Sequence, residues 1–509
     1  MSPNKPEFLV LHPRDNVAVA LVEISKGQEL EYNQTIALDT IPAGHKIAVN
    51  TIASGSAIIK YGQVIGYASR LISQGKHVHV DNVFLKARTQ RYYSTKSAIE
   101  TELIPSASRR TFEGFVRNNG RVGTRNFLGV LATVSCSADV AHFVADAIDR
   151  RLLSHFPSVD GVVAITHGSG CCHAPDSEGL DILRRTLSGY ANNPNFGGVI
   201  IIGLGCETNL VSSLMETTGL QEGDFLSSFT IQSEGGTTAT IEAGVAAAEK
   251  MLPTLNSHSR KRVSIEHLVV GLECGGSDAY SGITANPALG AAVDLIVKNG
   301  GTAVLSETPE IYGAEHLLVE RAQSEEVGNR LIDRIEWWED YTSQHNAQIN
   351  NNPTPGNKAG GISTILEKSM GAVTKGGSSN LTNVYRYAQT VKGPGLVFMD
   401  TPGYDVVSIT GMIAGGANII CFTTGRGTVS GFRPVPAMKL ATNSLMFNHL
   451  EGDMDINCGR ILDGECDIDQ MGIEIFEEII ATASGKQTKS EVLGFGGSDF
   501  VPWQIGAIL

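Results

Sequence analysis

Four cysteines follow apolar runs that predict buried strands. The runs cover 127–132, 161–165, 198–203 and 268–272, and the cysteines are Cys136, Cys171, Cys206 and Cys274. Their spacings are 35, 35 and 68 residues. About 35 residues accommodate one strand and its crossover helix in a parallel sheet, where ligands bind beyond the carboxyl ends of the strands. The pattern therefore predicts four thiols at one sheet edge.

Thiols in this arrangement favour a soft metal, with the choice of metal open. Thiolates select iron or zinc; four closed ligands are typical of structural zinc, and three with an open position are typical of a catalytic metal. The C-x-x-C pairing of zinc sites is absent, which disfavours structural zinc. Cys136 is less glycine-flanked than the other three cysteines. For each cysteine singly, the alternative is a small buried hydrophobic residue.

Histidines and an acid accompany these thiols. His167 precedes Cys171 by four residues, and it could be a ligand, a general base or a hydrogen-bonded loop histidine. Glu307 follows the predicted strand 302–305, so an acid arrives at the same edge. In the N-terminal region His45, and His77 with His79 on one side of a strand, could offer an acid–base group to a larger domain, where Lys60 could help to hold a carboxylate. A solvated edge is the alternative.

Two cations lie in glycine-rich loops. Lys358 and Arg426 have neither the spacing of a phosphate-binding loop nor that of a dinucleotide-binding motif. They are therefore interpreted as clamps for a substrate carboxylate, with Arg426 offering a bidentate fork. Ordinary surface charges are the alternative.

The rest of the chain indicates a multidomain α/β protein. Short β-like runs predict a β-rich domain at 7–90, then a polar linker at 91–111, a central α/β domain at 112–352 and a C-terminal α/β domain at 353–509. The net charge of −14 disfavours nucleic acid and anionic membranes as partners. No apolar run is long enough to span a membrane, and the first residues lack an apolar signal core. A cytoplasmic enzyme acting on a small molecule is expected, with its eight cysteines reduced, catalytic or metal-bound.

Several long segments, in order, resemble the altronate and galactarate dehydratase family. They are Gly44-His-Lys46, Ile59-Lys-Tyr-Gly62, His77-Val-His79, Gly120-Arg-Val-Gly-Thr-Arg-Asn126, Gly203-Leu-Gly-Cys-Glu207, the segment 272–287, Pro355-Gly-Asn-Lys-Ala-Gly-Gly361 and Phe422-Thr-Thr-Gly-Arg-Gly-Thr428. The resemblance implies an N-terminal SAF domain of the β-clip type, followed by Rossmann-like parallel α/β domains. It also implies an iron-dependent elimination of water from a hexonate or hexarate, giving a 2-keto-3-deoxy acid, with the altronate side favoured.

The resemblance also implies roles for the candidate residues. Iron would be held by Cys171, Cys206 and Cys274, with Cys136 optional, either as mononuclear Fe²⁺ or as an iron–sulfur cluster with one open iron. His167 and His45 would transfer protons, and Glu307 would orient a hydroxyl. Lys60, Lys358 and Arg426 would hold a carboxylate, and Ser277 and Asp278 would contact hydroxyls. A homodimer is expected.

Other functions are compatible with the same residues. Galactarate could replace altronate as substrate, since Thr428-Val-Ser-Gly431 lacks the proline that usually follows this family motif. A related lyase could release sulfite from sulfolactate. A sugar-acid-binding protein without turnover is the non-enzymatic alternative, and it is disfavoured because the polar strand-end groups that catalysis needs are present.

Overall fold

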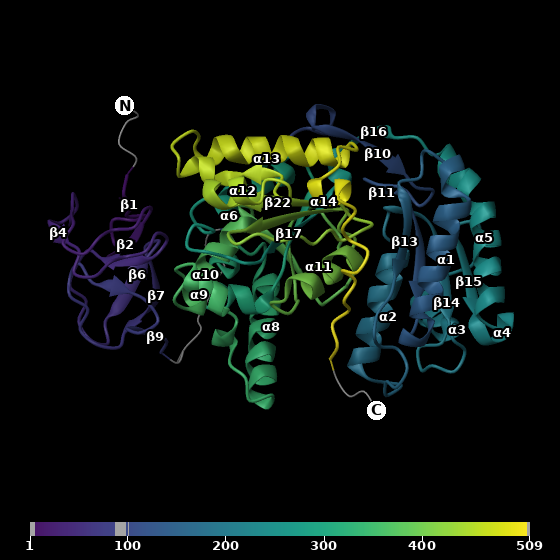
Figure 1. Cartoon of the computed structure of the whole chain (residues 1–509), viewed down its shortest axis with the longest axis horizontal. Coiled ribbons are helices and arrows are strands. Elements are labelled where there is room, and N and C mark those ends of the chain that lie inside the picture. The colour runs from purple at the N-terminus through teal and green to yellow at the C-terminus, as the bar shows by residue number, and fades with distance from the viewer. Residues whose placement is uncertain (1–5, 87–97, 100, 506–509) are drawn as a thin grey trace.

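The computed structural model describes residues 6–86, 98–99 and 101–505 (Figure 1). An N-terminal β domain, a four-stranded α/β domain and a larger α/β domain follow one another along the chain. The expected end of the first domain at residue 90, and the first part of the expected linker 91–111, lie outside the described residues.

The N-terminal domain is built of short antiparallel strands, which confirms the predicted β-rich module. Alternation along β6 is what buries an ionisable group here. Ile58 and Lys60 both point inward, while Ala57 and Ile59 are partly exposed. The strands are β1 (Phe8–Leu9), β2 (Val17–Ala20), β3 (Glu29–Leu30), β4 (Thr35–Ile36), β5 (Lys46–Ala48), β6 (Ala57–Lys60), β7 (Gln63–Ala68), β8 (His77–Val78) and β9 (Val83–Phe84).

The second domain has a parallel sheet in the order β13-β12-β14-β15. Helices α1 and α5 pack on one face, and α2 and α3 pack on the other. The elements are β12 (Phe127–Ala132), α1 (Ala138–Arg151), β13 (Gly161–Ile165), α2 (Glu178–Ala191), β14 (Phe196–Gly203), α3 (Val211–Thr218), β15 (Leu226–Thr230), α4 (Ile231–Glu234) and α5 (Thr237–Ser257). A small antiparallel sheet of β10 (Thr111–Val116), β11 (Val122–Gly123) and β16 (Lys261–Ser264) leads to the next domain.

The third domain has a seven-stranded parallel sheet in the order β19-β20-β18-β17-β21-β22-β23. Strands from both sides of residue 352 share this sheet, so the expected boundary between residues 352 and 353 lies within one sheet. Its strands are β17 (Val269–Cys274), β18 (Thr302–Leu305), β19 (Leu381–Tyr385), β20 (Gly395–Met399), β21 (Ile419–Thr424), β22 (Ala437–Ala441) and β23 (Ile456–Asn457). Its helices are α6 (Ala285–Lys298), α7 (His316–Val319), α8 (Glu325–Gln344), α9 (Pro355–Ala359), α10 (Ile365–Ala372), α11 (Asp405–Ala414), α12 (Ser444–His449), α13 (Ile468–Ala483) and α14 (Lys489–Val492).

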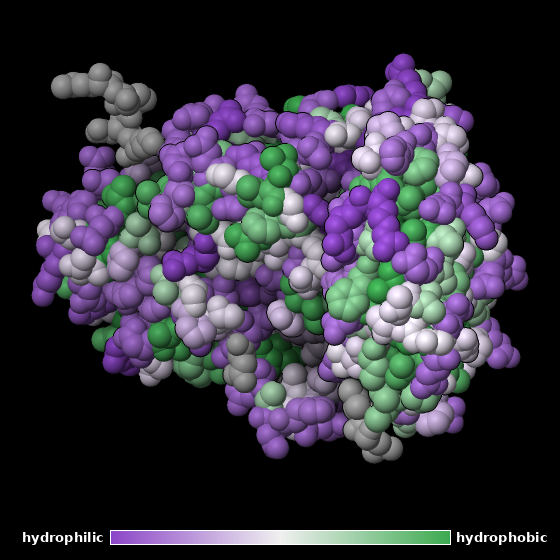
Figure 2. Space-filling view, turned by 45° about the vertical axis from the view of Figure 1, so that its right-hand side comes forward, coloured by the Kyte–Doolittle hydropathy of each residue, from purple (hydrophilic) through white to green (hydrophobic). Residues whose placement is uncertain are grey.

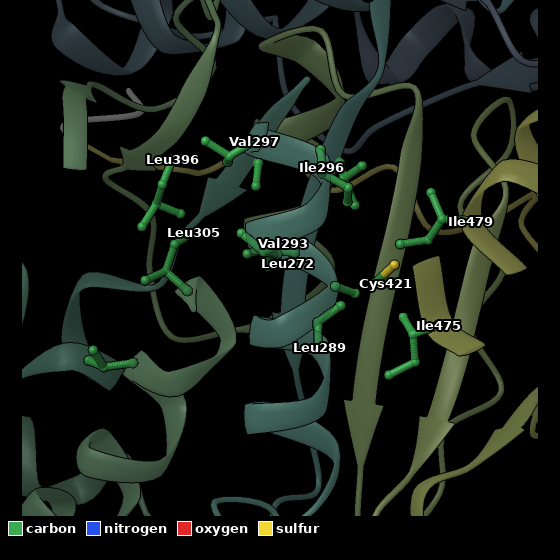
Figure 3. Packing of buried hydrophobic residues seen from close by; sticks show 14 of the residues in the cluster. Leu272, Leu289, Val293, Ile296, Val297, Leu305, Leu396, Cys421, Ile475 and Ile479 are labelled. Atoms are coloured by element: carbon green, nitrogen blue, oxygen red, sulfur yellow. The ribbon is translucent and has the colours of Figure 1, made fainter. Parts of the chain in front are cut away.

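The core of the third domain forms where α6 lies between the sheet and α13. Leu289, Val293 and Ile296 of α6 face Leu272 and Cys421 of the sheet and Ile475 and Ile479 of α13 (Figure 3). These side chains are fully buried, and each of the leucine, valine and isoleucine side chains stabilises the fold by about 1.5–3 kcal/mol relative to exposure. The resulting rigidity fixes the carboxyl ends of β17 and β21.

In each parallel sheet the order in which strands are added reverses at the first strand of that sheet. Strands β13 and β14 flank β12, and β18 and β21 flank β17. The carboxyl edge at such a switch point is where open α/β sheets bind ligands. The parallel α/β prediction is thus confirmed. Within the 68-residue interval between Cys206 and Cys274 the chain leaves one sheet and begins another.

The molecular surface is mixed. Hydrophilic side chains predominate on the face shown in Figure 2, with smaller hydrophobic patches among them. Within the described residues, we find no helix with the length and apolar character needed to cross a bilayer.

Candidate functional site

Three of the predicted cysteines gather at the carboxyl edge of the four-stranded sheet. Cys136, Cys171 and Cys206 follow the adjacent strands β12, β13 and β14, and all three are exposed. A hydrogen bond with Cys172, and then the neighbouring charges of Cys172, Cys136 and Cys206, raise the pKa of Cys171. The 35-residue spacing therefore predicted this part of the arrangement.

Glu207 shapes the loop that carries Cys206. Its carboxylate accepts hydrogen bonds from the backbone N–H groups of Gly205 (2.6 Å) and Cys206 (2.9 Å) and from the Thr133 hydroxyl (2.9 Å). Its oxygens are therefore occupied in holding the turn. The neighbouring Thr208 N–H donates to the Cys171 carbonyl at 3.0 Å, which ties the two cysteine loops together.

Cys274 belongs to a different site. It is the last residue of β17, is 1% exposed, and its Sγ donates to Glu310 Oε2 at 3.2 Å. Burial raises the pKa of this thiol to about 12. Among the described residues, no group of possible metal donors within 4.8 Å of one another contains Cys274 together with Cys171 or Cys206. The predicted three-thiol set is thus divided between two sheets.

His167 is held inside its own loop. Its Nε2 donates to the Ala132 carbonyl (3.1 Å), and its Nδ1 accepts from the Ser169 N–H (3.2 Å). Burial lowers its pKa to about 4, so the ring is neutral at pH 7. With both nitrogens engaged, the structure offers no free atom for the predicted acid–base role and makes this a loop-supporting histidine.

A buried acid–base cluster surrounds Cys274. Lys368 forms an ion pair with Glu310, and Lys375 lies 3.9 Å from Glu307. Burial raises the pKa of Glu310, but the charges of Lys368 and Lys375 outweigh it, so the net shift is downward. Burial, followed by the charges of Glu273 and Glu310, raises the pKa of Glu307 well above its usual range. Two nearby carboxyl groups are thereby given opposite protonation states, as acid–base catalysis requires.

Glu307 also has a strained backbone. Its φ of 68° lies in the left-handed region, which is uncommon for a residue other than glycine. Neither carboxyl oxygen makes a hydrogen bond within the described part of the chain. The predicted position at the strand end is correct, and the group found there is a buried acid.

Asp405 and Arg426 each come close to the glycine turn that follows β17. A Cβ on Gly275 would lie 2.0 Å from Asp405 Oδ2, and a Cβ on Gly276 would lie 3.2 Å from Arg426 Cβ. The glycines therefore allow both side chains to come close to the backbone that follows β17. Burial, then the charges of Glu273 and Glu310, raise the pKa of Asp405 to about 7.

Asp278 organises the loops instead of standing free. Its carboxylate accepts hydrogen bonds from Ser281 N (2.9 Å), Tyr280 N (3.1 Å), Thr442 Oγ1 (3.0 Å) and Asn443 Nδ2 (3.2 Å). Asp278 and the exposed Arg426 line a cavity of about 760 Å³, together with Gly44, Tyr280, Ala359 and Asn443. The predicted hydroxyl contact would have to compete with these four donors.

Ser277 and Lys358 directly precede two residues that line this cavity, Asp278 and Ala359. The Ser277 carbonyl accepts a hydrogen bond from Asn357 Nδ2 at 2.8 Å, which joins the turn after β17 to α9. Lys358 is half-buried in α9, immediately before Ala359 and Gly360 of the cavity wall. Their predicted substrate contacts stay predictions.

Lys60 is paired within the protein. Glu367 binds Lys60 Nζ at 2.9 Å and Lys46 Nζ at 2.8 Å, and all three groups are fully buried. Burial raises the pKa of Glu367, but the two ammonium charges dominate and lower it. Lys60 thus joins the N-terminal domain to α10, and its nitrogen is not free for the predicted carboxylate contact.

His45 lies in a cluster of three imidazoles. One ring nitrogen from each of His45, His77 and His79 lies within 4.8 Å of the other two. Burial lowers the pKa of each ring, that of His79 to about 4, so all three are neutral at pH 7. His45 also contacts the Ala359 carbonyl at 3.2 Å, which places the cluster against the cavity wall.

The structure also identifies residues that sequence reasoning did not choose. Glu310, Lys368 and Asp405 are the principal ones. Asp405 begins α11, six residues after β20, so the loop that follows the strand 395–399 could have indicated it. Lys368 had no comparable signal, because it lies within a helix.

Models of known protein families match all three domains of the chain. The model for the altronate/galactarate dehydratase SAF domain matches residues 6–86. The models described as D-galactarate dehydratase/altronate hydrolase, second domain, and D-galactarate/altronate dehydratase, C-terminal, match residues 114–256 and 265–508.

Full-length relatives support the same assignment. Altronate dehydratase from Bacillus subtilis (strain 168) is 37% identical over 489 residues, covering 95% of this chain and 96% of the relative. Galactarate dehydratase (L-threo-forming) from Escherichia coli (strain K12) is 38% identical over 487 residues, covering 94% and 93%. The beta subunit of (2R)-sulfolactate sulfo-lyase from Chromohalobacter salexigens is 31% identical over 390 residues, covering 76% and 95%. The chain therefore belongs to the altronate/galactarate dehydratase family of hydro-lyases.

Proposed function

We propose that this protein removes water from a hexonate or hexarate, such as altronate or galactarate, to give a 2-keto-3-deoxy sugar acid. The observation that carries the proposal is the glycine turn after β17, which Asp405 Oδ2 and the Cβ of Arg426 both approach. At this turn a base and a carboxylate-binding cation would both be within reach of one bound substrate. Similarity to both dehydratases over more than nine-tenths of the chain supports this substrate class.

The residues at this edge have protonation states suited to elimination. Asp405, with a pKa of about 7, is available as a base near neutral pH to remove the proton beside the substrate carboxylate. Arg426 would bind that carboxylate through its guanidinium fork. The raised pKa of Glu307 keeps a proton in the adjoining cluster, and this proton is available to the departing hydroxide.

Iron, which the family resemblance implies, is not assigned to the three thiols first predicted. Cys274 is separated from Cys171 and Cys206, and as a protonated thiol it donates to Glu310. An iron–sulfur cluster at Cys136, Cys171 and Cys206 is the alternative, and analysis of iron and acid-labile sulfide in anaerobically purified protein tests it.

A substrate panel tests the proposed reaction. Purified protein, with and without ferrous iron, is incubated anaerobically with altronate, galactarate and sulfolactate, and 2-keto acid and sulfite are measured. We expect keto acid from a hexonate or hexarate without sulfite. Absence of keto acid from every sugar acid in the presence of iron would refute the proposal.

Sulfite release is the second candidate reaction. The chain is similar to the sulfo-lyase beta subunit over 95% of the length of that subunit, and this similarity favours sulfite release as a second candidate. A sulfonate could occupy the position proposed for the substrate carboxylate or hydroxyl, since an arginine guanidinium can bind either anion. Sulfite production without dehydration of any sugar acid would select this alternative.

A further inference from the structure

Three imidazoles of the N-terminal domain converge on one point. The ring centroids of His45 and His79 are 4.7 Å apart, those of His45 and His77 are 5.1 Å apart, and those of His77 and His79 are 5.4 Å apart. One nitrogen of each ring lies within 4.8 Å of the other two. Three neutral bases with so little space between them form a preassembled set of nitrogen donors.

Contacts around the cluster indicate which ring nitrogens carry the lone pairs. His45 Nε2 donates to the Ala359 carbonyl, so the lone pair of His45 is on Nδ1, 3.0 Å from His77 Nε2. A second ring nitrogen that donates to a carbonyl is the usual arrangement of metal-binding histidines. His79 Nδ1 is buried and has no hydrogen-bond partner within the described part of the chain. An unpartnered buried nitrogen beside two other imidazoles indicates a missing ligand.

The backbone holding the rings is braced. Asn82 accepts from the His79 N–H (3.0 Å) and donates to the His77 carbonyl (2.8 Å), while β8 pairs with β5, the strand that directly follows His45. Ala359 adds a wall from the C-terminal domain. Gly44, next to His45, and Ala359, which His45 Nε2 contacts, both line the 760 Å³ cavity, so the cluster lies directly behind that wall.

We propose that His45, His77 and His79 bind one divalent transition-metal ion of the class Fe²⁺, Co²⁺ or Zn²⁺. Metal–nitrogen bonds of about 2.0–2.1 Å place ligand nitrogens roughly 3 Å apart, as His45 and His77 already are. Three protein ligands leave positions open, which is typical of catalytic sites, and imidazole suits these metals. The inference rests on the proposed function only for the use of the metal, which would polarise a substrate oxygen.

Cobalt titration tests the site without any substrate. Full-length protein is stripped with chelator, desalted and titrated with Co²⁺ while visible absorption is recorded. We expect one tightly bound equivalent, with affinity reduced at least about 100-fold in His77→Ala and His79→Ala. His345→Ala is the matched control, because this histidine is exposed directly after α8, and the affinity of this variant should equal that of the wild type. Unchanged affinity in both cluster variants would overturn the proposal.

X-ray absorption of the cobalt-loaded wild type gives an answer that needs no variant. A nitrogen and oxygen shell with imidazole scattering supports the histidine site, whereas sulfur ligands would overturn it in favour of the cysteine loops. Neither measurement uses turnover. Imidazole-bound cobalt, together with absence of keto acid in the iron-supplemented assay, would refute the proposed function and leave the metal site standing. Keto acid production together with sulfur-bound cobalt would do the reverse.

Discussion

Replacing Asp405 with asparagine should lower activity and raise stability at the same time. The pKa of this carboxyl is raised from 3.8 to about 7 in the folded protein. Because the folded-state pKa is the higher one, the folded protein loses stability as pH rises towards 7. The loss is about 4 kcal/mol at pH 8, calculated as 1.36 kcal/mol for each of about three pKa units. Asparagine carries no charge to desolvate and avoids this loss.

The pH dependence makes this prediction specific. At pH 5 only about 1.2 of the three pKa units contribute to the loss of stability. The free energy of unfolding of Asp405→Asn relative to the wild type should therefore increase by roughly 3 kcal/mol between pH 5 and pH 8, and level off above pH 7. Thermal melts of both proteins across this range would show the variant's melting temperature rising relative to the wild type. Asp340→Asn, which changes an exposed acid on α8, should show no such trend.

Activity provides the second half of the test. If Asp405 is the base, kcat of the variant should fall about 10²–10⁴-fold, and the wild-type rate should increase through pH 7 as the carboxylate forms. Kinetics at saturating sugar acid, from pH 5.5 to 8.5, would measure both. A variant that is stabilised but fully active would place Asp405 outside the reaction, and a variant that is neither stabilised nor inactive would contradict the buried environment itself.

Three further changes test other parts of the structure. Glu367→Gln leaves two buried ammonium groups without a full counter-charge and should lower the free energy of unfolding, measured with denaturant, by about 3–5 kcal/mol. Glu326→Gln removes one partner of an exposed ion pair and should leave the free energy of unfolding almost unchanged. Equal effects of the two substitutions would contradict the buried ion pairs. Gly275→Ala should displace Asp405 and reduce kcat at least tenfold, while Gly223→Ala, whose Cβ would meet open space, should not; matching kcat values would show that the close approach is unimportant. His167→Ala should lose two loop hydrogen bonds and lower the free energy of unfolding by about 1–3 kcal/mol, with less than a tenfold change in kcat. A larger loss of kcat at unchanged stability would restore the predicted catalytic role of His167.

Local sequence patterns predicted the elements well, because strand periodicity and glycine turns are local properties. The 35-residue spacing placed Cys136, Cys171 and Cys206 on one edge, as found. Cys274 follows an equally good strand, but which sheet a strand joins depends on long-range packing. The β17 run and the β14 run look alike in sequence and lie in different sheets.

Partners far apart in sequence account for the remaining differences. Alternation along residues 57–60 turns Lys60 inward, and that much is readable from the sequence. Its partner Glu367 lies 307 positions away, so nothing local distinguishes a paired lysine from one that is free to bind substrate. The same holds for Glu310, whose low pKa depends on Lys368, a contact 58 positions along the chain.

The ion pairs of Glu367 have a consequence for the order in which a newly made chain can fold. Lys46 and Lys60 are synthesised early, and the carboxylate that neutralises both follows 321 and 307 residues later. Until α10 has emerged, the N-terminal domain must hold two ammonium groups without their counter-charge, so it stays less stable than in the finished molecule. The adjacent Lys368 reaches the acid cluster from the same helix turn. One short stretch, made late, thus completes both the domain interface and the electrostatics of the proposed site.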